Sequence, residues 1–285
     1  MNLKAAIAFV KRALQGLNTD IETESSILVS YVCSIRKEDI FKDPEKELSS
    51  DEIELLEQLV LQRKGNTPLH YLIGNKDFYG RNYRLNESVL IPRPETEELC
   101  WHAIKYASIL RKPFKVLDIG TGSGVIAITL AAELSQARID AIDISSEAII
   151  VAKENAKNLL NRDQDRINFY NIGIENYNPQ NQYDIIISNP PYIPIGEGSE
   201  LMPEVKKEPA SALFAGEDGL DIYKKIYKKL PQLTTSQARV YLEIHSPNLG
   251  QNINLVRKML PSWQIVTYKD LQGRDRILEI IRAQQ

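Results

Sequence analysis

A rigid polar tetrapeptide stands directly after an apolar run in this sequence. The run DIIIS at 184–188 is typical of a buried strand, and Asn189, Pro190, Pro191 and Tyr192 follow at once. Because proline fixes its own φ and restricts the residue before it, the Asn189 side-chain oxygen and the Pro190 carbonyl become acceptors held in one place. An ordinary loop is the alternative. Two such acceptors favour a substrate with an NH₂ group on a planar system, packed against Tyr192.

An NH₂ group of this kind is a poor nucleophile, because its lone pair is delocalised into the neighbouring carbonyl or ring. Acceptors for both N–H bonds orient the lone pair towards an electrophile, such as the methyl group of a sulfonium, and favour pyramidal geometry at nitrogen. That is catalysis by positioning and electrostatics, without a strong base. We therefore predict that residues 189–192 are catalytic and bind the substrate, and that Asn189 also contacts the cofactor.

A glycine-rich loop is the second motif. The apolar run 116–119 leads into Gly120, Thr121, Gly122, Ser123 and Gly124, and an apolar helix follows. Glycine permits positive φ and close approach of a ligand to the backbone, and the N-terminus of the following helix offers unpaired N–H groups to an anion. These five residues are candidate cofactor contacts, although a tight structural turn would also explain them.

The glycine spacing favours one cofactor class. Dinucleotide enzymes use GxGxxG, which would require glycine where this chain has Val125, whereas the pattern here is GxGxG preceded by Asp118. A donor-rich loop with a nearby acid fits S-adenosyl-L-methionine, which carries a carboxylate and an amino group. Asp143 ends the next predicted strand, where it can accept hydrogen bonds from both hydroxyls of a ribose.

Composition sets outer limits. At 285 residues, with 43% hydrophobic content, the chain is expected to form one or two domains, and its net charge of −3 argues weakly against nucleic-acid binding. The two cysteines are far apart and the three histidines lack metal-ligand spacing, so we expect buried thiols in a reducing compartment and no metal. The longest apolar run, 125–132, is too short to span a membrane, and we expect a cytoplasmic protein.

The chain divides into three predicted parts. Residues 1–75 show helical periodicity over 3–15 and 20–35, and Ser49 with Glu52 predicts a capping box before a helix that ends near 63. Residues 76–94 include alternating polar and apolar positions over 77–92, which predict a hairpin turning at Asn-Glu-Ser 86–88 and linking two domains. The helical part is expected to position a substrate, or else to be a cap without function.

Residues 95–285 are predicted to form an α/β domain. A helix over 95–110 is followed by apolar runs that alternate with amphipathic helices, which is typical of a mostly parallel sheet covered on both faces. The last two strands, joined by a short loop, predict an antiparallel end. Because ligands bind beyond the carboxyl ends of such strands, residues 189–192 and the glycine loop should face each other. The lysines of 224–229 are expected on a solvated face, and the predicted strands are 114–119, 137–142, 167–171, 183–188, 238–244, 263–268 and 276–281.

The combination of NPPY with an upstream GxGxG loop resembles the amino-methyltransferases, which act on amino groups of adenine, cytosine or glutamine side chains. Further stretches resemble the HemK family of protein-glutamine methyltransferases, and best the bacterial enzymes that modify peptide chain release factors. These stretches are GNTPLHYLIGNKDFYG at 65–80, LIPRPETEEL at 90–99, EPASALFAGEDGLDIY at 208–223 and KDLQGRDRIL at 269–278.

The resemblance implies a class I S-adenosylmethionine-dependent methyltransferase fold, Rossmann-like, with a small N-terminal helical domain and a linking β-hairpin. It implies methylation of the glutamine in the Gly-Gly-Gln motif of class 1 release factors, with S-adenosyl-L-homocysteine as product, no membrane and no direct nucleic-acid contact. Carried over by position, the cofactor loop is 120–124, the ribose acid is Asp143 and the substrate clamp is 189–192.

Two positions depart from the family pattern. An acid and a large side chain usually follow the third strand and line the adenine, whereas this chain has Gly173 and Ile174, which leaves Ile174 as the expected adenine wall. Near the sixth strand, LEIHSPNLGQNI has Glu243 but an altered run after it, and no catalytic role is assigned there. The alternatives are a glutamine of a ribosomal protein, an amino group of nucleic acid, or a binding protein that retains the pocket without catalysis.

Overall fold

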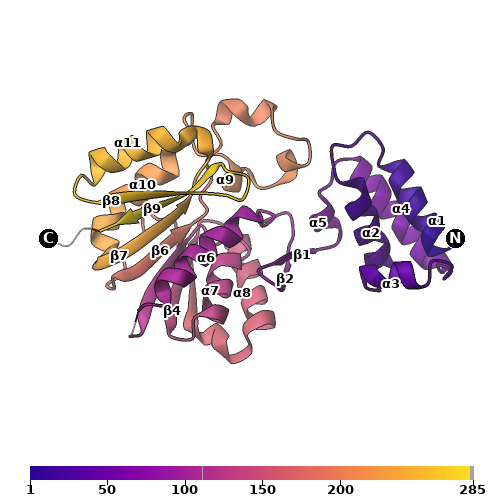
Figure 1. The fold of residues 1–285 in the computed structure, drawn as a ribbon, viewed down its shortest axis with the longest axis horizontal. Helices are drawn as coiled ribbons and strands as arrows, with labels where there is room; N and C mark the ends of the chain where they lie inside the picture. The colour runs from indigo at the N-terminus through magenta and orange to yellow at the C-terminus, as the bar shows by residue number, and fades with distance from the viewer. Residues whose placement is uncertain (111, 283–285) are drawn as a thin grey trace. The chain divides into compact units, whose positions relative to one another are not determined.

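The computed structural model describes residues 1–110 and 112–282. The chain forms two compact units. The first comprises Met1–Asn75 together with a distant segment, Met202–Lys207, and the second comprises the rest of the described chain from Lys76 onwards. Figure 1 shows the course of the chain through both units.

The first unit is helical, as expected. Its helices are α1 (Leu3–Ala13), α2 (Ile21–Val32), α3 (Lys37–Lys42), α4 (Ser50–Lys64) and α5 (Leu69–Leu72). The predicted capping box is confirmed, since the Glu52 amide donates to Ser49 Oγ (3.2 Å) and the Ser49 amide to Glu52 Oε2 (2.6 Å). The sequence reasoning missed α3 and α5, because six and four residues are too few to show a helical period.

A buried arginine holds the distant segment in the first unit. Arg63 on α4 is 2% exposed, and its guanidinium donates to both carboxylate oxygens of Glu24 on α2 at 2.8 and 2.9 Å. The same guanidinium pairs with Glu204 at 2.7 Å. Since Arg presents a planar fork of donors, one side chain can join both carboxylates. The buried ion pair thus contributes to joining residues 202–207 to the helical unit, together with the hydrogen bond from Lys207 Nζ to Thr67 Oγ1 at 3.1 Å.

We predict that Arg63→Met lowers the free energy of unfolding by about 3 kcal/mol, because it leaves two carboxylates without their buried partner. Chemical denaturation followed by circular dichroism measures the change. Arg36→Met is the matched control, since the Arg36 pair with Asp39 is exposed and should contribute nothing measurable. Equal losses in the two variants would contradict this account.

The second unit is built on a seven-stranded sheet with the order β5-β4-β3-β6-β7-β9-β8. The first five of these strands are parallel, and β9 pairs antiparallel with both β7 and β8. The predicted α/β class and the antiparallel end are confirmed. The bounds are β3 (Phe114–Ile119), β4 (Ala137–Asp143), β5 (Ile167–Asn171), β6 (Tyr183–Ser188), β7 (Thr234–Glu243), β8 (Gln264–Lys269) and β9 (Asp275–Ile281).

Helices cover both faces of this sheet (Figure 1). One apolar core joins the sheet to α6 (Glu95–Ala107), α7 (Val125–Glu133) and α8 (Ser146–Leu160). The other joins it to α10 (Asp221–Leu233) and α11 (Leu249–Met259), and the short α9 (Ala210–Leu213) precedes α10. The central strands β3 and β6 are buried along most of their length, and their apolar residues explain why both were predicted from the sequence. Strand β7 begins at Thr234, four residues before its predicted start at 238, because its first half is polar.

The hairpin turns earlier than predicted. Strands β1 (Asn75–Phe78) and β2 (Arg81–Arg84) are joined by Tyr79 and Gly80, which both have positive φ (49° and 71°). Two successive residues of this kind suit the right-handed twist of paired strands. A turn does form at 86–89, where the Val89 amide donates to the Asn86 carbonyl at 3.3 Å, but it is not the turn of the hairpin. The hairpin turn was misplaced because Tyr79-Gly80 is a weak turn signal. Residues 85–92 instead continue outside the two-stranded sheet.

Candidate active site

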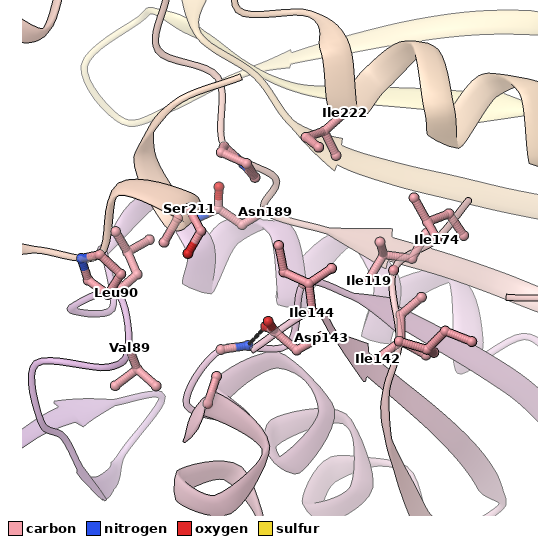
Figure 2. A pocket seen from close by; sticks show the side chains of 18 of the residues that line it. Val89, Leu90, Ile119, Ile142, Asp143, Ile144, Ile174, Asn189, Ser211 and Ile222 are labelled. Carbon is pink, nitrogen blue, oxygen red and sulfur yellow. Dashed lines mark hydrogen bonds between the residues drawn. The ribbon is translucent and has the colours of Figure 1, made fainter. Parts of the chain in front are cut away.

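A cavity opens at the carboxyl ends of β3, β4 and β6, where the sequence reasoning expected the two motifs to meet. It is lined by Gly120, Gly122, Asp143, Ile174, Asn189 and Pro191 among the predicted site residues. The other predicted residues are not part of the cavity lining; they are Thr121, Ser123, Gly124, Pro190 and Tyr192. Figure 2 shows Asp143, Ile174 and Asn189 around the same space.

The glycine loop has the backbone that its sequence predicts. Gly120, Gly122 and Gly124 have positive φ values of 71°, 55° and 84°. A Cβ at Gly120 or Gly122 would meet no atom within 4 Å, so open space lies in front of the loop. Gly124 caps α7 and packs closely, since a Cβ added there would lie 2.9 Å from Ile128 Cδ1 and 3.1 Å from Ala152 Cβ. Two glycines thus face the cavity, and the third permits close packing of α7 on α8.

A buried asparagine on α8 ties the glycine loop to the hairpin. The Asn155 side-chain NH₂ donates to the carbonyls of Ser123 (2.9 Å) and Arg84 (3.0 Å), and its oxygen accepts from the Arg84 amide (2.8 Å). Asn155 is only 1% exposed, so these contacts within the protein take the place of hydrogen bonds to water. The chain beyond β2 is thereby directed to the cavity, where residues 88–90 line its wall.

We predict that Gly124→Ala lowers the free energy of unfolding by about 1–3 kcal/mol, because an alanine there is strained at positive φ and clashes with α8. Thermal unfolding measures the effect. Gly250→Ala on α11 is the matched control, since nothing lies within 4 Å of the added methyl group and helical glycine is the less favourable residue. A control that is destabilised as much as Gly124→Ala would contradict the argument.

Asp143 closes the carboxyl end of β4 and faces the cavity. Its Oδ2 accepts from the Gly122 amide at 2.9 Å, drawn as a dashed line in Figure 2, and its Oδ1 accepts from the Ser145 amide at 2.9 Å. Burial raises the pKa of this carboxyl above its usual value, and the backbone hydrogen bonds oppose that rise. Each carboxylate oxygen retains a lone pair for a further donor in the cavity.

Asp118 has a structural position behind the loop. Its Oδ2 accepts from Thr121 Oγ1 (2.7 Å) and from the amide of Ala127 in the first turn of α7 (3.2 Å). Its Oδ1 is buried without a hydrogen-bond partner. Burial raises the pKa of the Asp118 carboxyl group to about 7. Asp118 does not line the cavity. It therefore shapes the glycine loop and the start of α7, and reaches any ligand only through them.

Asn189 is oriented by two residues that are far away in sequence. Its Nδ2 donates to Thr96 Oγ1 on α6 at 3.0 Å, and Thr96 Oγ1 donates to Glu243 Oε2 at the end of β7 at 2.7 Å. Both Thr96 (2% exposed) and Glu243 (1% exposed) are buried. With its NH₂ group engaged there, the Asn189 side-chain oxygen is available to the cavity.

Tyr192 forms part of a stacked pair beside this wall. Its ring stacks on His245, with centroids 5.5 Å apart and an interplanar angle of 12°. Burial raises the pKa of Tyr192 to about 12 and lowers that of His245 below its usual value. At neutral pH both rings are therefore uncharged, which suits an apolar packing surface.

The cavity wall beyond β5 is mainly apolar, and Figure 2 shows Ile174 and Ile142 on the opposite side of the view from Val89 and Leu90. Gly173 lies between Ile172 and Ile174, and the family's acid is absent at that position. The Glu175 carboxylate lies against Gly173, and its Oε1 accepts from Lys225 Nζ at 2.9 Å. The Lys225 side chain is 42% exposed, in agreement with the predicted solvated face, and it also lines the cavity.

Several cavity residues escaped the sequence reasoning because they come from unrelated segments. They lie after β2, in and before α9, and on α10, and none belongs to a motif with a chemical pattern of its own. The LIPRPETEEL and EPASALFAGEDGLDIY stretches contained part of this information, but only as resemblance. These residues are Ser88, Val89, Leu90, Pro209, Ser211, Ala212, Ile222 and Lys225.

The described chain has neither a metal site nor a membrane-spanning helix. In residues 1–110 and 112–282, no group of three His, Cys, Asp or Glu side chains is arranged to hold a metal ion. Within the same ranges, no helix has the length and apolar character needed to cross a membrane.

Comparison with known proteins matches both units. Residues 5–74 match the family model of the PrmC N-terminal domain, and residues 106–212 match that of the methyltransferase small domain. A release factor glutamine methyltransferase of Bacillus anthracis is 34% identical over 284 residues, which cover 98% of each chain. The same-named protein of Streptococcus pneumoniae is 39% identical and covers 85% of this chain and 84% of its own.

The chain belongs to the release factor glutamine methyltransferase family. Solved structures support the fold alone. A methyltransferase from Pyrococcus furiosus has a TM-score of 0.51 at 17% identity and covers 79% of this chain and 96% of its own. The hMettl16 catalytic domain has a TM-score of 0.54 at 18% identity and covers 82% of each chain. The second unit thus has the S-adenosylmethionine-dependent methyltransferase fold, with the helical PrmC N-terminal domain before it.

Proposed function

We propose that this protein transfers a methyl group from S-adenosyl-L-methionine to the side-chain amide nitrogen of the glutamine in the Gly-Gly-Gln motif of class 1 peptide chain release factors. Full-length similarity to release factor glutamine methyltransferases supports the substrate. The observation that carries the chemistry is the position of Asn189, which lines the same cavity as Asp143 and the glycine loop and whose NH₂ group is held by Thr96. A release-factor substrate implies a reaction in the cytoplasm.

The residues around the cavity fit the cofactor. Gly120 and Gly122 leave open backbone for a close ligand, and Asp143 retains lone pairs for the two ribose hydroxyls. Ile142, Ile144 and Ile174 would pack against an adenine ring. Thr121, Ser123 and Gly124 act through the shape of the loop. When bound, S-adenosyl-L-methionine supplies an electrophilic methyl group, and the nitrogen that takes it gives up one of its two protons to water.

Asn189 and Pro190 act on the substrate. Asn189 lines the cavity, and Pro190 follows it directly in the chain. In the proposed mechanism the Asn189 side-chain oxygen and the Pro190 carbonyl accept the two N–H bonds of the glutamine amide and thereby direct its lone pair into the cavity. Pro191 lines the wall and keeps the backbone rigid, while Tyr192 supports the planar group. No strong base is required, because the acceptors favour the pyramidal nitrogen that forms during transfer.

The helical unit has a separate proposed role. Residues 1–75 dock the release factor, and the hairpin region 76–94 joins them to the methyltransferase domain of 95–285. Support comes from the match of residues 5–74 to the family model of the PrmC N-terminal domain, which treats this helical part as a domain of its own. A variant that lacks residues 1–75 would test this role by its KM for release factor.

We predict that incubation of the protein with S-adenosyl-L-methionine and purified release factor adds one methyl group to the Gly-Gly-Gln glutamine, detected by mass spectrometry. Asn189→Ala should lower kcat by at least about 100-fold, because one of two positioning acceptors is lost, and leave cofactor affinity largely intact. A release factor with glutamine replaced by asparagine is the substrate control. Transfer instead to a ribosomal protein or to RNA, with the release factor unmodified, would overturn the substrate.

We predict that Asp143→Asn raises the Kd for S-adenosyl-L-methionine by about 10-fold to 100-fold, because hydrogen bonds to a charged acceptor are lost. Isothermal titration calorimetry measures the affinity. Asp163→Asn is the matched control, since the Asp163 side chain is exposed and lies outside the cavity lining. An unchanged Kd in a folded Asp143→Asn protein would exclude the ribose role.

A further inference from the structure

The direction in which the Asn189 amide faces is decided outside the NPPY motif. A side-chain amide can turn either its oxygen or its NH₂ group to the cavity, and only the oxygen accepts an N–H bond. Asn189 Nδ2 lies 3.0 Å from Thr96 Oγ1, and Thr96 Oγ1 lies 2.7 Å from Glu243 Oε2. Two consecutive hydrogen bonds therefore connect Asn189, which lines the cavity, to the buried side chains of Thr96 and Glu243.

We propose that Thr96 and Glu243 are positioning residues for the methyl transfer: a carboxylate at 243 forces the Thr96 hydroxyl to donate inwards, so that Thr96 Oγ1 must accept from the Asn189 NH₂ group. The inference rests on the proposed function, since it concerns the same acceptor. A carboxylate has no proton and can only accept, which leaves the Thr96 hydroxyl one direction. The Asn189 oxygen is then held towards the substrate amide.

A neutral Glu243 would remove this constraint. A protonated carboxyl can donate to Thr96 Oγ1, which frees the Thr96 hydroxyl to donate to the Asn189 oxygen. The amide can then rotate and present its NH₂ group to a substrate that also presents N–H bonds. An Asn189 NH₂ group cannot accept the N–H bonds of the substrate and so cannot orient the substrate amide. The active arrangement therefore requires the ionised carboxylate of Glu243.

Burial of Glu243 is complete enough for this protonation to occur near neutral pH. Desolvation raises its pKa to about 7, against the Thr96 hydrogen bond and the positive charge of Arg276. The Tyr223 hydroxyl donates to the Glu243 backbone oxygen at 2.6 Å and leaves the carboxylate to Thr96. Six other titratable groups face Glu243. They are Glu95 and Cys100 on α6, Arg93 just before α6, Tyr192 of the NPPY motif, Tyr223 on α10 and Arg276 on β9.

The direct test compares two variants at position 96 with a control at position 129. Thr96→Val keeps the shape and removes the hydroxyl, and should lower kcat by about 10-fold to 100-fold with the Kd for S-adenosyl-L-methionine unchanged. Thr96→Ser restores the hydroxyl and should recover most of kcat. Thr129→Val, which removes a buried hydroxyl on α7 that contacts Tyr83, should retain wild-type kcat. A Thr96→Val enzyme with wild-type kcat would overturn the proposal.

The pH profile separates positioning from simple packing. For the wild-type protein, kcat at saturating substrates should fall as pH falls through about 7, since protonation of Glu243 releases Asn189. In Glu243→Gln, position 243 carries no titrating proton, so kcat should no longer fall as pH falls through about 7. Its kcat at high pH should be lower than that of the wild-type protein, because the carboxylate that orients Thr96 is missing. Retention of the acidic fall in kcat with an unchanged midpoint would exclude Glu243 as its source.

A third measurement does not require methyl transfer. The side-chain NH₂ signals of Asn189, assigned by nitrogen-15 NMR, should shift on titration through pH 7 in the wild-type protein and remain constant in Glu243→Gln. If the release factor proves not to be the substrate while these signals titrate, the relay stands and the substrate assignment fails. If the Asn189 signals shift with pH in the same way in the wild-type protein and in Glu243→Gln, and the enzyme methylates release factor, the proposed role of Thr96 and Glu243 is overturned and the substrate assignment remains.

Discussion

The site depends on the alignment of three parallel strand ends. Strand β3 lies between β4 and β6, with Ile119 opposite Ile142 and Asp118 opposite Ile187. Because parallel strands in such a register end at one edge, the loops that follow them open into the same space. The glycine loop, Asp143 and Asn189 are brought together by this constraint, although Asn189 lies 69 positions after Gly120 in the chain. The segment after β2, the short α9 and α10 complete the walls of the cavity at that edge.

The buried acids next to this edge weaken the fold at neutral pH. Asp118 and Glu243 are almost fully buried, and desolvation raises the pKa of each to about 7. Since their unfolded values lie near 3.8 and 4.5, the folded protein binds more protons than the unfolded chain between those values and 7. Folding therefore becomes less favourable as pH rises through this window. Such shifts cluster at functional sites, and here Asp118 shapes the cofactor loop while Glu243 faces Thr96.

The segment that follows the NPPY motif starts in the second unit, enters the first unit at 202–207 and returns to the second unit at Glu208. Ile193 pairs with Phe214 in the second unit, residues 202–207 join the helical unit through Arg63, and Glu208 returns to accept from Arg93 at 2.5 Å. Glu208 also accepts from the Ile91 amide at 3.0 Å. The backbone therefore connects the two units at residues 75–76 and again on either side of 202–207. Any change in the helical unit that releases Glu204 acts on a segment covalently continuous with the catalytic motif.

The α/β class, the central strands and the two motifs follow from local sequence alone, because strands buried on both faces are rich in apolar residues and because GxGxG and NPPY restrict their own backbone. Local pattern misplaced the hairpin turn, since Tyr79-Gly80 is a weak signal. Only the tertiary structure decided which way Asn189 faces. Thr96 and Glu243 look like an ordinary helix residue and an ordinary strand end, and their chemistry arises from burial and from contacts across 93 and 147 residues of chain.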